Sequence, residues 1–258
     1  MKLQRPQWPR AMAARLLSRS PLRFWPVRIQ HGFLRGSRWT LWPHSAYWLG
    51  NYEPEVQAAL SRLGLGSGGA AWDLGAHFGF YTLWLARAVG PSGQVCAFEP
   101  DAVSFGRLRR HVGMNGLDNV RIYRRAVSDF TGELVLIQNE GAGATTSHLP
   151  YQGETLPRDN TVAVQAVTLD ALMEGDQLRP PNFMKIDIEG HAAAALRGAR
   201  GLLSRHRPVL LVSMHSPDEV EGVRSQAVPL GYSPCALDGS PIGWPDTLFK
   251  TVVLQPAP

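Results

Sequence analysis

The clearest pattern along the chain is an apolar run, Ala70–Leu74, followed by a glycine-containing turn and a second apolar segment, Phe80–Val89. In the second segment the apolar residues recur at helical spacing, so the pattern predicts a strand, a tight turn and a helix. Two shorter apolar runs, Gln94–Phe98 and Val120–Tyr123, have the length of buried strands. Strands that alternate with helical segments predict an α/β fold.

The second half of the chain continues this alternation. Residues 184–188 form a fourth predicted strand, and Asp187 and Glu189 lie on the same face of it if the backbone stays extended. Val209–Met214 is the fifth predicted strand. We also expect helices at Pro54–Leu63 and residues 192–203, and strand-like runs at residues 134–137 and 162–167.

The turn after the first strand indicates the kind of ligand. It reads D-L-G-A-H-F-G from Asp73 to Gly79, and its glycines would let backbone amides approach a ligand at the start of a helix. Dinucleotide-binding turns usually read G-x-G-x-x-G and lack this carboxylate. A carboxylate repels phosphate but suits a cationic amino group, such as the methionine end of S-adenosylmethionine (SAM). A strand, turn and helix packed without any ligand would share the pattern.

Two more strand ends carry polar side chains. Glu99 and Pro100 follow the second strand, where an acidic residue can bind both hydroxyls of a ribose, although a solvated loop glutamate would look the same. Ser128 and Asp129 follow the third strand, where an oxygen could accept a hydrogen bond from an adenine amino group. Ligands of open α/β sheets bind at the carboxyl ends of the strands, so these residues predict one common site.

The order of these motifs resembles the FkbM family of SAM-dependent methyltransferases. The matching stretches are G-N-Y-E-P-E-V at 50–56, D-L-G-A-H-F-G-F-Y-T at 73–82, V-C-A-F-E-P-D at 95–101, M-N-G-L-D-N-V at 114–120, A-V-S-D at 126–129, V-T-L-D at 167–170, K-I-D-I-E-G at 185–190 and P-V-L-L-V-S-M-H at 208–215. Together they span about residues 28–258. The resemblance implies a Rossmann-like class I methyltransferase fold: a mostly parallel seven-stranded sheet with helices on both faces, plus an N-terminal extension.

The resemblance also implies a set of SAM contacts. The expected cofactor-binding residues are Glu53, Asp73, Gly75, Ala76, His77, Gly79, Tyr81, Glu99, Pro100, Ser128 and Asp129. Tyr52 is a further contact to cofactor or substrate, whereas Glu53 could equally cap the helix that follows it. The chain departs from the family pattern at His77, where asparagine is more common, and at Ser213, where glutamate is more common.

The chemistry is expected at the fourth and fifth strand ends. An alcohol that accepts a methyl group must lose its proton, and a general base assists that loss. The candidates for this base are Asp187 and Glu189, followed by His215. Glu189 could instead cap the next helix, and His215 could serve only its loop. The three residues could also hold a divalent ion, but we expect no metal.

Charge is concentrated at the start of the chain. Residues 1–52 contain nine of the 26 Lys and Arg residues, no Asp or Glu, and five of the eight tryptophans. Interleaved Arg and Trp predict attraction to anionic phosphate, at a membrane surface or on nucleic-acid bases. We divide the chain into a basic tail (1–26), a hairpin extension (27–52) that the resemblance places near the active site, and a SAM-binding domain (53–258). The tail is expected to be mobile or to lie on a membrane surface as a helix.

The acceptor is expected to be a small molecule or glycan with a hydroxyl group, bound by the long polar stretch at residues 141–160. Thr145, Thr146, Ser147 and His148 there offer hydroxyl and imidazole groups. A flexible linker would have a similar composition. Loops of this length inside a domain are usually functional or disordered.

Three other functions share some of these features. An NAD-dependent oxidoreductase would share the fold but needs the G-x-G-x-x-G turn, which is absent here. A nucleic-acid methyltransferase would explain the basic N-terminus, yet Pro180-Pro181-Asn182 precedes the fourth strand and forms no N-P-P-Y motif. A non-catalytic protein would have no reason to keep the cofactor residues. We therefore expect a SAM-dependent O-methyltransferase.

The cysteines and the apolar runs indicate where in the cell the protein is located. The two cysteines, Cys96 and Cys235, indicate neither a disulfide framework nor a metal cluster. No apolar run approaches the roughly 20 residues that cross a bilayer, and no signal-peptide core follows Met1 and Lys2. We therefore expect a cytoplasmic protein.

Overall fold

The computed structural model describes residues 24–42, 45, 47–138, 148–149, 159–175, 178–245 and 250–257. Two predictions fall largely outside these residues. They are the basic tail at 1–26, of which only residues 24–26 are described, and the acceptor loop at 141–160, including Thr145, Thr146 and Ser147. Among the described helices, none combines the length and the apolar character that a membrane span needs.

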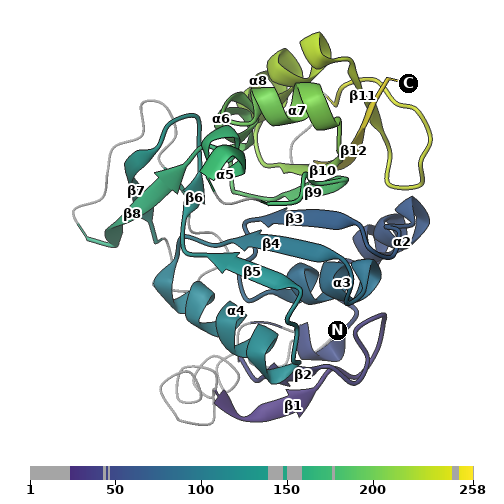
Figure 1. The fold of residues 1–258 in the computed structure, drawn as a ribbon, viewed down its shortest axis with the longest axis vertical. Coiled ribbons are helices and arrows are strands. Elements are labelled where there is room, and N and C mark those ends of the chain that lie inside the picture. Colours follow the sequence, from purple (N-terminus) through teal and green to yellow (C-terminus); the bar gives the residue numbers. More distant parts are fainter. Residues whose placement is uncertain are drawn as a thin grey trace, which may run out of the picture.

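A seven-stranded sheet forms the centre, with the strands in the order β5-β4-β3-β9-β10-β12-β11 (Figure 1). The strands are β3 (Ala70–Leu74), β4 (Gln94–Phe98), β5 (Val120–Tyr123), β9 (Phe183–Ile186), β10 (Val209–Met214), β11 (Tyr232–Cys235) and β12 (Lys250–Pro256). All neighbours pair in parallel except β12, which is antiparallel to both β10 and β11. The predicted mostly parallel seven-stranded sheet is confirmed. The strand order reverses between β3 and β9, which is the switch point where such sheets bind ligands.

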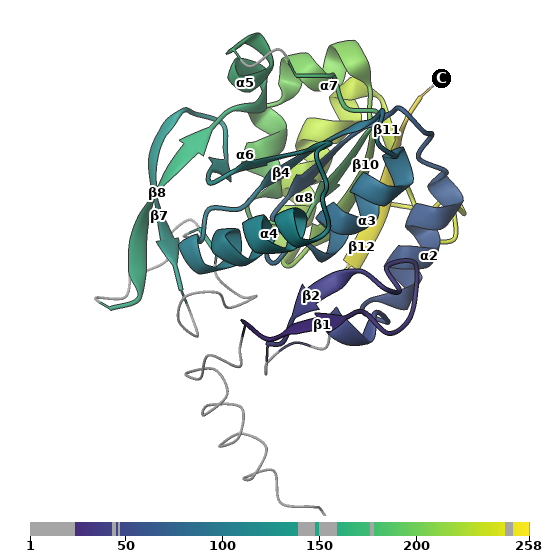
Figure 2. The same cartoon turned by 60° about the horizontal axis from the view of Figure 1, so that its bottom comes forward.

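Helices cover both faces of this sheet (Figures 1 and 2). One layer consists of α2 (Pro54–Leu63), α3 (Phe80–Val89) and α4 (Ala102–Met114), and the other of α5 (Leu169–Gly175), α6 (Ala192–Arg197), α7 (Arg200–His206) and α8 (Pro217–Ala227), with the short η3 (Val228–Leu230) after it. Side chains alternate between the layers along each strand. Trp72 and Leu74 belong to the core under α6–α8, whereas Ala71 and Val95 pack in the core under α2 and α3.

The single helix predicted at residues 192–203 is wrong, because the structure has two helices there. α6 ends at Arg197 and α7 begins at Arg200. Gly198 lies so close to the Ser128 carbonyl that a Cβ would collide with it. Asp170 then caps the new helix, because its carboxylate accepts from the amides of Gly201 (2.8 Å) and Leu202 (2.7 Å).

A second, three-stranded sheet lies beside the carboxyl edge of the central one. It contains β6 (Ala126–Val127), β8 (Thr161–Val167) and β7 (Gly132–Ile137) in the order β6-β8-β7, and the β7–β8 hairpin projects away from the sheet (Figure 1). The predicted strands at 134–137 and 162–167 are therefore confirmed. His148 forms an isolated bridge with Ile137, which places its side chain in the wall of the site described below.

The predicted N-terminal hairpin is confirmed as β1 (Pro26–Arg28) paired with β2 (Arg38–Thr40), followed by η2 (Tyr47–Leu49). His111 on α4 anchors it: Nε2 accepts from the Thr40 amide (3.1 Å) and Nδ1 lies 2.7 Å from the Phe78 carbonyl. Burial lowers the pKa of His111 to about 3, so the ring is neutral. Trp39 stacks on this ring at 3.6 Å and is fully buried, so it is a core residue and not part of a surface that binds phosphate.

Candidate functional site

The turn between β3 and α3 has a backbone that requires glycine. Gly75 (φ +79) and Gly79 (φ +89) are left-handed, and a Cβ on Gly75 would collide with the carbonyl oxygen of Asp187. The amides of Gly75 and Ala76 both donate to the Phe98 carbonyl, at 3.0 and 2.9 Å. These two amides are thus bonded within the protein, and the predicted cofactor contacts of Gly75 and Ala76 stay a prediction. They tie the turn to β4, and the glycines let the turn lie flat against the next loop.

Asp73 is fully buried at the end of β3. Its Oδ2 accepts from the Thr82 hydroxyl at 2.6 Å, while Oδ1 has no hydrogen-bond partner within the described ranges. Burial raises the pKa of the carboxyl, and the nearby Lys185 ammonium partly offsets this. A buried acceptor without a donor is costly, so Oδ1 marks a place where a donating or cationic ligand group would be stabilised.

Glu99 at the end of β4 is buried and fixed, not a solvated loop residue. Its two oxygens accept from the amides of His77 (2.7 Å) and Asp101 (2.8 Å). Burial raises its pKa to about 8. Each carboxylate oxygen has a second lone pair, so both can still accept from a diol.

Ser128 and Asp129, predicted to contact adenine, face other residues. The Ser128 hydroxyl lies 3.0 Å from His191 Nε2, and Asp129 pairs with Arg197 at 2.9 Å. The pocket wall at this strand end is made by Arg125, Ala126 and Val127 instead. The adenine contact of Ser128 and Asp129 stays a prediction.

A group of tyrosines covers the site from the N-terminal extension and α3. Tyr81 donates to Glu53 at 2.7 Å, and the Tyr47 hydroxyl lies 3.3 Å from His77 Nδ1. Burial, followed by nearby acidic groups or tyrosines, raises the pKa of Tyr47, Tyr52 and Tyr81, so all three are neutral donors. Glu53 stands at the N-cap of α2 but makes no capping bond with its side chain.

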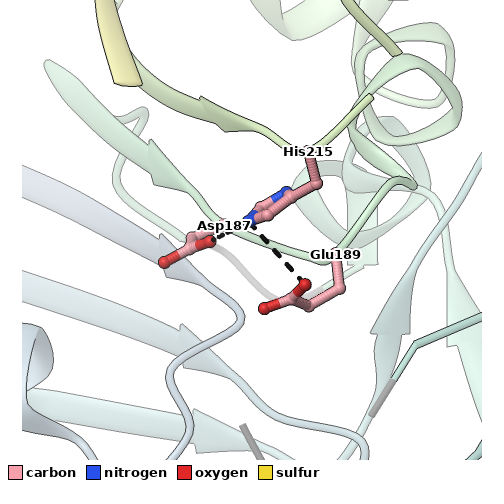
Figure 3. A group of neighbouring side chains, drawn as sticks. All are labelled: Asp187, Glu189 and His215. Carbon is pink, nitrogen blue, oxygen red and sulfur yellow. Dashed lines mark ion pairs between the residues drawn. The ribbon is translucent and has the colours of Figure 1, made fainter. Parts of the chain in front are cut away.

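The three candidate catalytic residues meet at one point (Figure 3). His215 Nε2 lies 3.4 Å from Asp187 Oδ1 and 3.7 Å from Glu189 Oε2. The strand does not stay extended as assumed, because β9 ends at Ile186 and Glu189 is left-handed (φ 49). The turn nevertheless brings both carboxylates to the histidine that follows β10. Glu189 does not cap α6: the amide of Ala192 donates to Glu219 instead, at 3.1 Å.

Charged neighbours fix the ionisation of this cluster. Asp187 Oδ2 pairs with the buried Lys185 ammonium at 3.0 Å, and this pair outweighs burial, so the pKa of Asp187 is lowered and that of Lys185 raised. Burial raises the pKa of Glu189. Burial alone would lower the pKa of His215, but Glu219, Glu189 and Asp187 together hold it above its usual value.

Sequence reasoning missed Glu219, which contacts His215 at the ring nitrogen that faces away from Asp187 and Glu189. Its Oε2 accepts from the His215 amide at 2.7 Å and lies 3.4 Å from His215 Nδ1. The Glu219 side chain is only 1% exposed. A signal was present, because Ser216 and Glu219 have the S-x-x-E spacing of a helix start, and Ser216 indeed caps α8.

The predicted residues line two adjoining hollows at the switch point. The larger is lined by Tyr47, Tyr52, Gly75, His77, Phe98, Glu99, Pro100, Asp101, Arg125, Ala126, Val127, Leu136, His148, Leu149, Asp187, Ile188 and Glu189. The smaller adds Asp73, Ala76, Phe78, Phe80, Tyr81 and Lys185. Gly79, Ser128 and Asp129 line neither hollow. Glu53 and His215 do not line them either, but Glu53 contacts Tyr81 and His215 contacts Asp187, which do. Tyr47 and Arg125 are wall residues that sequence reasoning did not identify.

This arrangement defines a class I SAM-dependent methyltransferase: a parallel sheet with a switch point, an acidic turn after its first strand and a buried glutamate after its second. The family follows from direct comparison. The model of the methyltransferase FkbM domain matches residues 73–232, and the chain belongs to this family. The resemblance seen in the sequence and the SAM cofactor are thereby confirmed.

Individual relatives match part of the chain. The TRM61 catalytic subunit of tRNA (adenine(58)-N(1))-methyltransferase from Cryptococcus neoformans is 39% identical over 136 residues, 52% of this chain and 29% of that protein. Hexuronic acid methyltransferase AglP from Haloferax volcanii is 25% identical over 159 residues, 60% of this chain and 61% of AglP. The crystal structure of methyltransferase FkbM from Methylobacillus flagellatus shares the fold, with a TM-score of 0.50 at 20% identity over 74% of this chain and 44% of that one. The chain thus spans less than two thirds of each relative.

The residues present fit SAM. The unpartnered Oδ1 of Asp73 offers an acceptor at the smaller hollow, where the cationic amino group of the methionine end requires one. Glu99 offers two fixed oxygens in the larger hollow, which is what a ribose diol requires. The hollows share Tyr47, Tyr52, Gly75, His77 and Asp187, so one ligand can extend through both.

Proposed function

We propose that this protein transfers the methyl group of SAM to a hydroxyl group of a polar small molecule or glycan. The observation that carries the proposal is that Asp187 and Glu189 line the same pocket as Glu99. Acid–base side chains next to a cofactor site can take the proton that a hydroxyl loses on methylation, which accelerates such steps by about 10²- to 10⁴-fold. The name of the relative AglP, hexuronic acid methyltransferase, favours a sugar as the acceptor.

In this proposal the chain has three tasks. SAM, when bound, supplies a methyl group on a positively charged sulfur. Asp73 and the turn that follows it hold the methionine end, Glu99 holds the ribose, and the tyrosines close the pocket towards the N-terminal extension. The cluster of Asp187, Glu189 and His215 orients the acceptor hydroxyl and receives its proton. Such alignment of reacting groups contributes several kcal/mol to catalysis.

A second candidate is methylation of a nucleic-acid base. It is favoured by the 39% identity to the TRM61 catalytic subunit, a tRNA adenine-N1 methyltransferase, over 136 residues. The two candidates are separated by the acceptor: labelled SAM would be tested with a panel of uronic acids and neutral sugars, and with unmodified tRNA transcripts. Labelling of a sugar hydroxyl would support the proposal, and labelling of tRNA alone would replace it.

We further propose a reducing, cytoplasmic location. Cys96 and Cys235 are both buried and neither is part of a disulfide, which suits a reducing compartment. A role of the basic tail at a membrane surface stays a prediction.

Cofactor binding is tested by thermal unfolding with S-adenosylhomocysteine and, separately, with NAD. A ligand at one hundred times its dissociation constant stabilises the folded state by about 2.7 kcal/mol, so the midpoint should rise with S-adenosylhomocysteine. We expect no rise with NAD, because Asp73 stands where a pyrophosphate would bind. A rise with NAD alone would contradict the proposal.

Replacing Glu99 by alanine is expected to weaken SAM binding at least tenfold without unfolding the protein. Because the pKa of Glu99 is about 8 in the free protein, most of the carboxyl is protonated at pH 7, while ribose hydroxyls donate best to the ionised form. SAM binding should therefore release a proton and tighten about tenfold between pH 7 and pH 9. Calorimetry at several pH values measures this. The Glu99→Ala protein controls for titration of SAM itself, and equal pH dependence in both proteins would contradict the ribose assignment.

A further inference from the structure

We propose that Asp187, Glu189 and His215 bind a single divalent cation, and that the acceptor hydroxyl completes its coordination. The role of the cation in catalysis rests on the proposed function, whereas the arrangement of its three ligands does not. One ligand atom from each residue lies within 4.8 Å of the other two. The His215 Nε2 distances of 3.4 and 3.7 Å to the two carboxylate oxygens are close to the separation of about 3.0–3.4 Å between neighbouring ligand atoms around an ion with bonds near 2.1 Å.

The second nitrogen of His215 supports a metal-binding role. Nδ1 faces the buried Glu219 carboxylate at 3.4 Å, and the same carboxylate holds the His215 amide at 2.7 Å. Metal-binding histidines almost always donate their other ring N–H to such a group, which fixes the tautomer. With its proton on Nδ1, His215 presents a lone pair at Nε2. In that form Nε2 and the two carboxylate oxygens are three acceptors around one point, and a divalent cation there takes the place of the Nε2 proton that otherwise lies between the ring and the two carboxylates.

Lys185 does not already fill this position. Its ammonium contacts Asp187 Oδ2, whereas Oδ1 is the oxygen that faces His215. The pair fixes the carboxylate so that Oδ1 points at the cluster (Figure 3). Three carboxylates, Asp187, Glu189 and Glu219, surround His215, and Lys185 pairs with only one of them, so a divalent ion in place of the Nε2 proton of His215 improves the local charge balance.

The ion would act on the acceptor. Two carboxylates and one imidazole suit Mg²⁺, Mn²⁺, Fe²⁺ or Zn²⁺, and three protein ligands leave positions for substrate. A hydroxyl bound there loses its proton more readily, because the positive charge stabilises the alkoxide. With the ion present the cluster would assist loss of the proton through the ion and would not take the proton itself. The proton leaves to water, the oxygen forms a bond to the methyl carbon, and the carbon–sulfur bond breaks to give neutral S-adenosylhomocysteine.

The site is tested by titrating the full-length, tag-free, chelator-treated protein with Mn²⁺ alone and counting free ion by electron paramagnetic resonance. We expect one Mn²⁺ per chain, and a dissociation constant at least tenfold weaker in Glu189→Gln and in His215→Gln. Asp218→Asn, an exposed carboxylate in the first turn of α8, is the matched control and should bind like the parent. Absence of stoichiometric binding, or equal binding by all four proteins, would overturn the proposal.

Activity separates this inference from the proposed function. Methyl transfer to a hydroxyl that persists unchanged in excess chelator would overturn the cation site and leave the O-methyltransferase standing. Stoichiometric Mn²⁺ binding that the two variants weaken, in a protein that methylates only tRNA, would support the site and overturn the proposed acceptor.

Discussion

Asp187→Asn is expected to lower the methyl-transfer rate at least about a hundredfold, with a smaller effect on SAM affinity. The carboxylate stands between Lys185 and His215 and lines the pocket next to Glu99. Asparagine keeps the size of the side chain but removes the charge that orients the acceptor and assists the loss of its proton. Single-turnover rates and calorimetric SAM affinity, measured on the same preparation, separate the two effects.

The same substitution has a cost in stability that must be measured alongside. Lys185 is buried but the Asp187 side chain is 25% exposed, so the substitution should destabilise the protein by less than the roughly 3–5 kcal/mol typical of a fully buried pair. Asp73 is a second carboxylate near Lys185 and should reduce this loss. Asp118→Asn, in the exposed turn between α4 and β5, is the control and should change neither rate nor stability appreciably. If folded Asp187→Asn protein turns over at the parental rate, the cluster is not where the chemistry occurs.

Patterns of apolar residues were sufficient to predict the architecture of the central sheet. Four strands, β3, β4, β9 and β10, are buried on both faces, and so they appear as largely apolar runs bounded by polar turns. The edge strand β5 is only partly buried. The prediction of a single helix at 192–203 was wrong because the break between α6 and α7 depends on a tertiary contact, the approach of Gly198 to the Ser128 carbonyl. Local propensity contains no such information, and six residues of mostly alanine favour a continuous helix.

The candidate site was predictable where its residues follow strand ends and unpredictable where they come from elsewhere. Asp187, Glu189 and His215 follow neighbouring parallel strands, whose carboxyl ends meet at one edge. Tyr47 lies in η2, after the β1–β2 hairpin that the hydrogen bond between Thr40 and His111 anchors, so its approach to the site depends on the packing of a separate segment. Glu219 contacts the site only through Nδ1 of His215, and the orientation of that ring is set by the fold and not by the sequence spacing.

Gly75→Ala is expected to be the most disruptive single-methyl change in the site. The residue is left-handed, and its added Cβ would meet the backbone oxygen of Asp187, which cannot move without displacing the turn that carries Asp187 and Glu189. We expect a loss of about 3 kcal/mol or more in the free energy of unfolding, since strain and collision add. Whatever protein remains folded should bind SAM at least tenfold more weakly, because the turn forms the floor of both hollows.

Gly106→Ala supplies the matched comparison, because the substitution is chemically identical and only the backbone differs. Gly106 lies inside α4, where an added methyl group would meet nothing within 4 Å. Alanine there should stabilise the helix by up to about 1 kcal/mol. Urea unfolding of the two variants should therefore move in opposite directions from the parent. A Gly75→Ala protein as stable as the parent would mean that the contact between the β3 turn and Asp187 is looser than the structure has it. The close approach of this turn to the Asp187, Glu189 and His215 cluster would then lose its structural basis.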